Sequence, residues 1–134
     1  MEYRYQSEAI SGEAFADLLN RSGLAARRPA GDIPRLQRML DNAELLITAR
    51  TVDGELVGIA RSLTDWCYAT YLSDLAVDAA HQSKGIGTRL IEETRKIAGP
   101  ETMLLLVAAP DAAEYYEKIG MPRCDRAFLY PRQK

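Results

Sequence analysis

The most informative segment of this chain reads Gln82-Ser83-Lys84-Gly85-Ile86-Gly87-Thr88. It stands between a strand-like segment and a segment with helical periodicity, so it predicts a strand-to-helix turn. The first amides of a helix lack intrahelical partners, and the helix dipole adds positive potential there. Glycines at 85 and 87 allow close approach of the backbone, and Lys84 and Thr88 can add donors. The segment therefore predicts a binding site for a pyrophosphate.

The residues around the glycines separate this segment from other phosphate-binding loops. The dinucleotide fingerprint needs a third small residue where Leu90 stands, and the Walker pattern needs glycine before lysine, whereas Lys84 precedes Gly85. An isolated Gly-x-Gly can also mark a tight turn and nothing more. The residues outside the loop are therefore needed to distinguish a phosphate-binding loop from a simple tight turn.

Downstream of the loop, the pattern predicts elements of an α/β protein. An amphipathic helix over residues 87–98 ends at Gly99-Pro100. The apolar run 103–107 is typical of a strand covered on both faces and would return parallel to the strand expected over 68–77. A last helix starting at Pro110-Asp111 and ending at Gly120, then a closing strand over 127–130, complete the chain.

Upstream of residue 68, the pattern predicts two helices and three strands. The expected elements are a strand over 3–5, a helix from Ser11 to Gly23, a helix capped by Asp32 that ends at Asn42, and a hairpin of strands 45–51 and 56–62 joined at Asp53-Gly54.

Composition narrows the class of protein. The chain has 134 residues and 47% hydrophobic content, which predicts one folded domain over 1–134. A net charge of -2 gives no basic footprint for nucleic acid. The longest apolar stretch is far shorter than the roughly 20 residues that cross a bilayer, and no signal peptide is evident, so we expect a cytoplasmic protein without a membrane partner. Cys67 and Cys124 lack metal-ligand spacing, so no metal is expected and both should be reduced.

Two motifs resemble the GNAT superfamily of N-acetyltransferases. Gln82, Gly85 and Gly87 match the family's pyrophosphate loop, Gln/Arg-x-x-Gly-x-Gly/Ala. Ala112-x-x-Tyr115-Tyr116-Glu117-Lys118-Ile119-Gly120-Met121 resembles the family's Ala-x-x-Phe-Tyr-Glu-Lys-x-Gly-Phe segment. Together they span residues 71–121 in the family's order. The resemblance implies an acyl-coenzyme A N-acyltransferase fold, α/β or α+β, with a mixed, mostly antiparallel sheet, a central parallel strand pair and flanking helices.

The resemblance also implies a site and a co-substrate, acetyl-coenzyme A. Tyr116 would protonate the leaving thiolate, and the Val77 N–H would polarise the thioester carbonyl. Ala109 replaces a frequent family Asn and Met121 a frequent Phe, which puts one coenzyme contact in doubt. The implied coenzyme-binding residues are Leu75, Ala76, Val77, Gln82, Ser83, Lys84, Gly85, Ile86, Gly87 and Thr88.

The general base is not evident. Strand alternation puts Leu72, Asp74 and Ala76 on one face, opposite the face that holds residues 71, 73, 75 and 77. A bulge would change that parity, so Asp74 is a candidate base beside a water chain. His81 is expected to be structural or solvated, and Tyr115 suits core packing better than Tyr116 does.

The acceptor is expected to be a primary amine of a small molecule, acetylated by direct attack. A protein or peptide N-acetyltransferase and a non-catalytic acyl-coenzyme A-binding sensor are the alternatives. A homodimer is expected, because exposed closing strands can pair with another chain. The Trp66 side chain could cover the edge of the hydrophobic core. A group of arginines could form a solvated surface or contact an anion on the acceptor or coenzyme: Arg21, Arg27, Arg28, Arg35 and Arg38.

Overall fold

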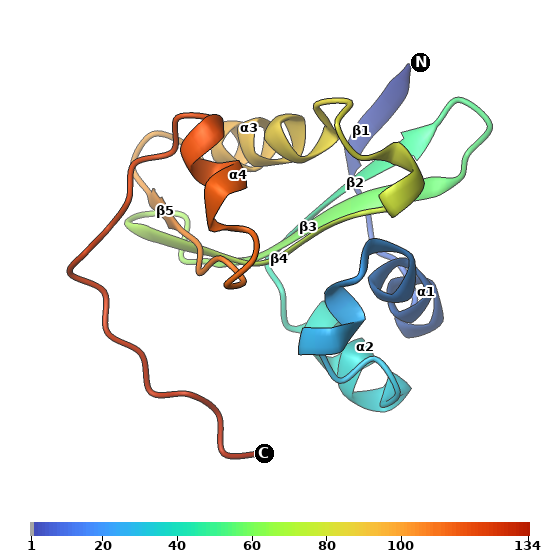
Figure 1. Cartoon of the computed structure of the whole chain (residues 1–134), viewed down its shortest axis with the longest axis horizontal. Coiled ribbons are helices and arrows are strands. Elements are labelled where there is room, and N and C mark those ends of the chain that lie inside the picture. Colours follow the sequence, from blue (N-terminus) through green and yellow to red (C-terminus); the bar gives the residue numbers. More distant parts are fainter. Residues whose placement is uncertain (1) are drawn as a thin grey trace.

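A computed structural model describes residues 2–134 as one five-stranded sheet with helices on both faces (Figure 1). The elements are β1 (Tyr3–Ser7), α1 (Gly12–Ser22), the short helix η1 (Leu24–Arg27), α2 (Ile33–Asp41), β2 (Leu45–Thr51), β3 (Leu56–Thr64), β4 (Ala69–Val77), the short helix η2 (Ala79–His81), α3 (Ile86–Ala98), β5 (Met103–Leu105) and α4 (Ala113–Lys118).

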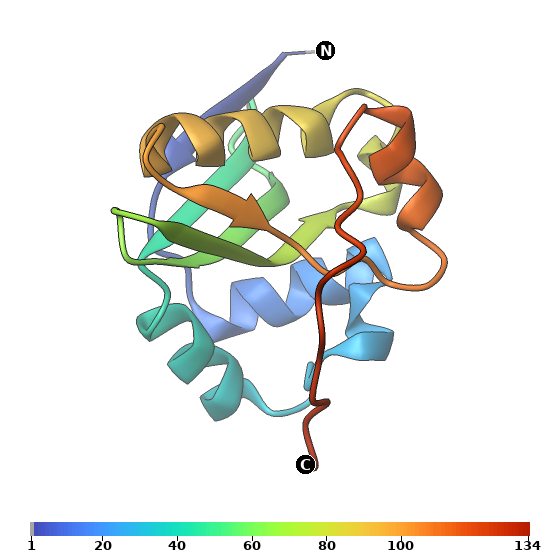
Figure 2. The same cartoon turned by 90° about the vertical axis from the view of Figure 1, so that its left-hand side faces the viewer.

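The sheet runs in sequence order from β1 to β5. Adjacent strands from β1 to β4 pair antiparallel, and β4 and β5 pair parallel. The α3 helix covers one face of the sheet, and α1 and α2 cover the other (Figures 1 and 2). The predicted fold class, a mixed and mostly antiparallel sheet with one parallel pair and flanking helices, is therefore confirmed.

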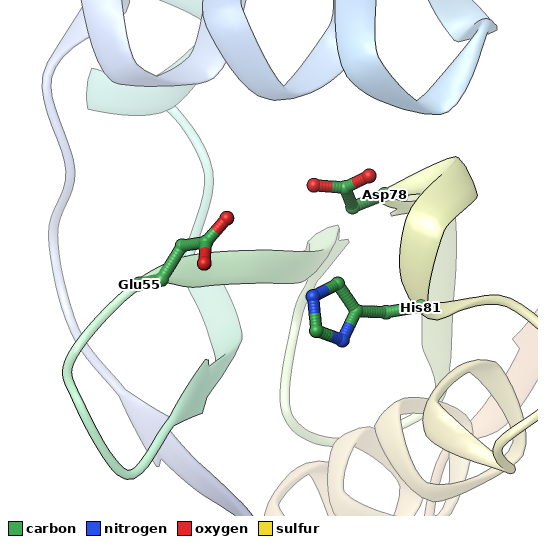
Figure 3. A group of neighbouring side chains, drawn as sticks. All are labelled: Glu55, Asp78 and His81. Carbon is green, nitrogen blue, oxygen red and sulfur yellow. The ribbon is translucent and has the colours of Figure 1, made fainter.

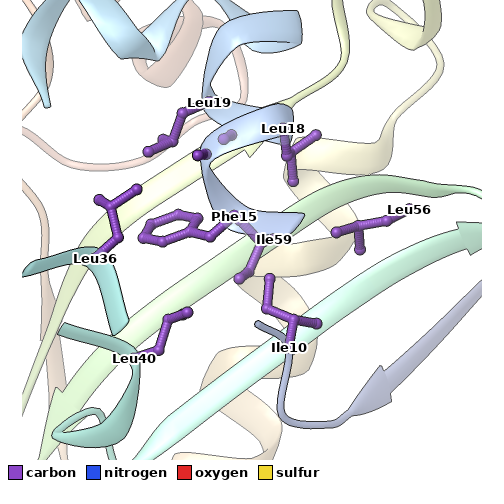
Figure 4. Packing of buried hydrophobic residues seen from close by; sticks show 10 residues of the cluster. Ile10, Phe15, Leu18, Leu19, Leu36, Leu40, Leu56 and Ile59 are labelled. Carbon is purple, nitrogen blue, oxygen red and sulfur yellow. The ribbon is translucent and has the colours of Figure 1, made fainter. Parts of the chain in front are cut away.

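Two apolar clusters hold the layers together, one on each face of the sheet. Phe15 of α1 and Leu36 of α2 are fully buried with Ile59 of β3 in the first cluster (Figure 4). Leu90 of α3 packs over Ile47 and other strand residues in the second. Each such side chain stabilises the fold by about 1.5–3 kcal/mol through removal of apolar surface from water.

Local signals in the sequence set the helix boundaries. The Ser11 hydroxyl accepts a hydrogen bond from the Ala14 amide at 3.1 Å, and the Asp32 carboxylate accepts one from the Arg35 amide at 3.1 Å. The predicted helix start at Ser11 and the predicted cap at Asp32 are therefore confirmed. Gly23 ends α1 with φ +85°, in the left-handed region that favours glycine. No helix within residues 2–134 is long and apolar enough to cross a membrane.

The parallel pair is short and lies at one edge of the sheet, so the expected central position of this pair is wrong. β4 pairs with β5 only from Ala69 to Tyr71, and β5 ends at Leu105 instead of continuing to Val107 as predicted. Beyond this point β5 leads into the loop before α4, and no strand of residues 2–134 pairs with the second half of β4 on that side. The second half of β4 therefore has an open edge, and the candidate site lies along it.

The predicted closing strand over 127–130 is wrong. These residues form no strand, and the side chains of Phe128, Leu129 and Tyr130 are 97%, 71% and 100% exposed. Residues 127–130 do not pair with β5. The flanking Pro122 and Pro131 have no backbone N–H and cannot donate a hydrogen bond to a neighbouring strand. The expected homodimer, which rests on an exposed closing strand, stays a prediction.

Two smaller predictions near turns are also wrong. The last helix begins at Ala113, and Ala112 rather than Asp111 occupies its N-cap, without a side-chain bond. Trp66 does not plug the core edge, because it lies in the turn between β3 and β4 with φ +66° and 44% exposure. The Asp65 carboxylate fixes that turn by accepting three backbone amides.

Candidate active site

A cavity of about 860 Å³ opens between the carboxyl end of β4, the glycine loop, α4 and the α1–η1 connection. Every residue predicted to bind the coenzyme lines it except Lys84. The loop before α4 supplies Ala109, at the position of the missing family Asn. The lining residues are Ser22, Gly23, Leu24, Ala26, Arg27, Leu75, Ala76, Val77, His81, Gln82, Ser83, Gly85, Ile86, Gly87, Thr88, Ala109, Pro110, Asp111, Ala112, Tyr115 and Tyr116.

The backbone of β4 presents free polar groups to this cavity. The amide of Asp78 donates to the carbonyl of Val57 at 2.8 Å, so the next pair, Val77 with Gly58, is a pair without hydrogen bonds. The N–H and C=O groups of Val77 consequently point away from β3, and alternation gives Leu75 the same direction. The Gln82 side chain donates to the Val77 carbonyl at 3.3 Å, which ties the loop to the strand end.

The glycine loop turns through two residues in the left-handed region. Ser83 has φ +63° and Gly85 has φ +80° at the N-cap of α3. The first α-helical bond of α3 runs from the Arg89 amide to the Gly85 carbonyl at 3.0 Å. The amides of residues 86–88 therefore have no intrahelical partner, and such a run of free amides after a left-handed residue is a concave anion site.

Gly87 allows α4 to approach the start of α3. A Cβ at this position would lie 2.5 Å from the Tyr115 hydroxyl, which also lies 3.2 Å from the Thr88 hydroxyl. The space beside Gly87 is therefore filled by Tyr115, a packing role that the sequence did not indicate. Gly85 has open space around the corresponding position.

Replacing Gly87 with alanine is expected to destabilise the fold by about 1–3 kcal/mol, because the new methyl group would overlap the Tyr115 hydroxyl. In a Tyr115→Phe background the nearest atom becomes a ring carbon at 3.2 Å, so the same substitution should cost less. Urea denaturation of the four proteins of this double-mutant cycle measures the difference. An equal loss of unfolding free energy in the wild-type and Tyr115→Phe backgrounds would rule out the steric contact between the new methyl group and the Tyr115 hydroxyl.

Tyr116 lies deeper than Tyr115. It packs against the cluster under α3, and its ring meets the Tyr115 ring edge-on with centroids 5.1 Å apart. Burial, with a smaller effect of Tyr115, raises the pKa of the Tyr116 phenol above its usual value. The expectation that Tyr115 suits core packing better is wrong, since Tyr115 is 37% exposed at the loop.

A second cavity of about 200 Å³ adjoins the first. Both cavities are lined by Arg27, Leu75 and Tyr116, so Tyr116 stands where they meet. No sequence signal identified this second cavity. Its lining residues are Leu24, Arg27, Arg28, Tyr71, Leu72, Ser73, Leu75, Leu106, Val107, Ala108, Ala109, Ala112 and Tyr116.

The Asp74 carboxylate is fully buried between two arginines. Arg28 of the loop before α2 and Arg61 of β3 each form an ion pair with it. The pairing of β3 and β4 shifts at Ser73, so Leu72 packs under α3 while Asp74 faces the side of α1 and α2. The bulge thus changes the alternation predicted for this strand. With both oxygens held by guanidinium groups, Asp74 is not placed to act as a base.

Arg21 also turns inward, toward Asp78 at 2.5 Å and the Leu56 carbonyl at 2.9 Å. The expected solvated arginine surface is therefore wrong for Arg21 and Arg28. Burial favours a higher pKa for Asp78, but the Ala80 amide and Arg21 outweigh it and lower that pKa. Asp78 thus fixes η2 beside the glycine loop.

Asp78 also belongs to a group with Glu55 and His81, whose ligand atoms lie within 4.8 Å of one another (Figure 3). The Asp78 oxygens already accept bonds from Arg21 and from the Ala80 amide. His81 Nδ1 lies 2.9 Å from the Tyr3 hydroxyl, and the two rings meet edge-on. These engagements give His81 a structural role that holds β1 against η2.

Several solved structures are similar to this chain. A proposed acetyltransferase from Deinococcus radiodurans R1 is 25% identical, with a TM-score of 0.74 over 96% of this chain and 87% of the other. A ribosomal-protein-alanine N-acetyltransferase from Brucella melitensis biovar Abortus 2308 is 24% identical, with a TM-score of 0.72 over 98% and 99%. An aminoglycoside acetyltransferase from an uncultured soil metagenomic sample, solved with sisomicin, is 20% identical, with a TM-score of 0.69 over 98% and 97%.

No curated protein matches the sequence. A family model does match it, over residues 12–121, and this range includes the glycine loop, β4 and α4. The model is that of the acetyltransferase (GNAT) family. By its sequence and by its fold, this chain belongs to the acetyltransferase (GNAT) family.

Proposed function

We propose that this protein transfers an acetyl group from acetyl-coenzyme A to a primary amine of a small molecule by direct attack. One observation carries the proposal: a large cavity on the anion-binding loop and a small cavity meet at the Tyr116 side chain. A two-substrate transfer needs two binding spaces that meet at the reacting atoms.

The residues of the larger cavity fit acetyl-coenzyme A. The free amides after Gly85 suit a pyrophosphate, because they combine orphan donors with the positive end of α3. The outward-facing backbone groups of Leu75 and Val77 suit the amides of the pantetheine arm, which can add to the open strand edge. The arm would then extend from the loop toward Tyr116, so the thioester would lie at the junction of the cavities.

The junction supplies donors for the charges that form during transfer. The amine nitrogen bonds to the thioester carbonyl carbon, and the carbon–sulfur bond then breaks. The Val77 N–H would stabilise the oxyanion, and the Tyr116 hydroxyl would give its proton to the departing sulfur. The raised pKa of Tyr116 keeps that proton in place at neutral pH. The proton of the amine would pass to a water molecule, because no carboxylate of residues 2–134 lines the small cavity.

The size of the second cavity favours a small acceptor. At about 200 Å³ it holds less than the roughly 300–1,000 Å³ of a drug-sized ligand site. The similar structures include one enzyme named for a ribosomal protein and one named for aminoglycosides, so the family supports either class of acceptor. A peptide amine therefore belongs in the test.

Thiol release from acetyl-coenzyme A tests the proposal directly. The purified protein should release free thiol only when a suitable small amine is present, and mass spectrometry should find the acetylated amine. A panel of amines with an alanine-initiated peptide separates the two acceptor classes. Acetylation of the peptide alone would overturn the small-molecule assignment, and binding without any transfer would favour a sensor.

Replacing Gly85 with glutamate should raise the KM for acetyl-coenzyme A by at least about tenfold, because a carboxylate would face the phosphates and the residue has φ +80°. Gly54→Glu is the matched control, since Gly54 has φ +90° and lies in the β2–β3 turn outside both cavities. Steady-state kinetics of both variants measures the effect. Similar KM values in the two variants would argue against phosphate binding at the loop.

A further inference from the structure

The small cavity carries positive charge without a balancing carboxylate. Its lining contains Arg27 and Arg28 and, among residues 2–134, no aspartate or glutamate. Behind its wall, the guanidinium groups of Arg28 and Arg61 share the single carboxylate of Asp74. Two cations with one anion leave a positive charge, and Arg27 adds another.

The two arginines of the lining differ in what they can still bind. Each nitrogen of the Arg28 guanidinium is engaged: Nε with Asp74, Nη1 with the Arg27 carbonyl at 2.9 Å, and Nη2 with the Ser73 carbonyl at 2.8 Å. The Arg27 side chain is exposed and makes no ion pair or side-chain hydrogen bond within residues 2–134. Since Arg27 lines both cavities, its donors stay available beside Tyr116.

This charge affects an amine in two ways. Nearby positive charge disfavours an ammonium ion, so it lowers the pKa of a bound amine and increases the fraction of the neutral nucleophile. The same charge repels an acceptor that carries several ammonium groups. An acceptor with an anionic group would gain a charge-assisted, bidentate contact with a guanidinium.

We propose that the acceptor is an amine that also carries a carboxylate or a phosphate, and that Arg27 binds this anionic group. The inference rests on the proposed acetyl transfer and specifies its acceptor. It places the anionic group beside the junction and the amine next to the thioester. It also sets this chain apart from enzymes that acetylate polycationic aminoglycosides.

Matched pairs of amines test the inference. L-tyrosine is compared with tyramine, L-phenylalanine with phenethylamine, and glucosamine 6-phosphate with glucosamine, and sisomicin represents the polycations. The ratio of kcat/KM within each pair should favour the anionic member by about 10- to 100-fold. The amino acid pairs and the sugar pair distinguish a carboxylate from a phosphate.

The variants Arg27→Ala and Arg27→Lys show whether Arg27 causes the preference. Arg27→Ala should remove it mainly through a higher KM, Arg27→Lys should keep part of it, and Arg38→Ala, exposed and outside both cavities, should keep all of it. Three results would overturn the inference. The first is a preference for the neutral or cationic amines, the second is transfer to none of the anionic amines, and the third is a preference for anionic amines that survives Arg27→Ala. Transfer to the neutral members of the pairs separates these results from a failure of the proposed function, in which no amine of the panel would be acetylated.

Discussion

Replacing Tyr116 with phenylalanine is expected to lower kcat by about 100-fold or more while the Kd for acetyl-coenzyme A changes by less than about threefold. The hydroxyl matters mainly when charge develops on sulfur, so its loss affects the transition state more than the bound substrate. Its pKa is raised by burial, and the phenol should therefore stay protonated up to at least its ordinary value of about 10. Accordingly, kcat should show no alkaline decline below that pH from this group.

The control for this prediction is Tyr68→Phe. Tyr68 is 74% exposed next to the β3–β4 turn and lines neither cavity, so the variant should keep its activity. Steady-state kinetics over a pH series and calorimetry with acetyl-coenzyme A give both parameters. An unchanged kcat in Tyr116→Phe would remove Tyr116 from the mechanism.

Replacing Asp74 with asparagine is expected to lower the free energy of unfolding by about 3–5 kcal/mol, because the Arg28 and Arg61 guanidinium groups would lose their shared anion. Both cations would remain beside the sheet, and Arg61 is nearly buried, with 8% of its side chain exposed. The loss would also release the loop before α2, which carries Arg28 and lines the small cavity. Urea denaturation followed by circular dichroism measures the effect.

Asp17→Asn provides the comparison for the ion pair. Asp17 pairs with Arg21 on the surface of α1 with 67% of its side chain exposed, so its replacement should change the free energy of unfolding by less than about 1 kcal/mol. Comparable small losses in both variants would show that the Asp74 ion pairs contribute little to stability.

The sequence was sufficient to predict the fold wherever local chemistry determines an element. Ser11, Asp32 and Gly23 mark helix ends through caps and a left-handed residue, and these signals act within a few residues. The sequence alone did not reveal that residues 127–130 form no strand, or that β4 has a bulge at Ser73, because strand pairing depends on residues far apart in the chain. The early end of β5 at Leu105 was not predicted for the same reason, since it depends on the pairing of β5 with β4.

For the candidate site, the sequence predicted the glycine loop and the β4 edge but not the second, smaller cavity. Gln82 and Gly85 belong to one contiguous motif, so their proximity follows from spacing. Arg27 and Tyr116 line the same two cavities because the fold brings η1 and α4 together, and nothing in the spacing of these two residues indicates this. The burial of Asp74 likewise depends on Arg61 from a neighbouring strand.

Titration of the intact protein with acetyl-coenzyme A by calorimetry tests the central claim most directly, because every later step depends on that complex. We expect saturable binding with one molecule per chain, retained in Tyr116→Phe and greatly weakened in Gly85→Glu. The absence of binding to the intact protein, or binding that Gly85→Glu leaves unchanged, would contradict the assignment of the glycine loop and the large cavity to the coenzyme.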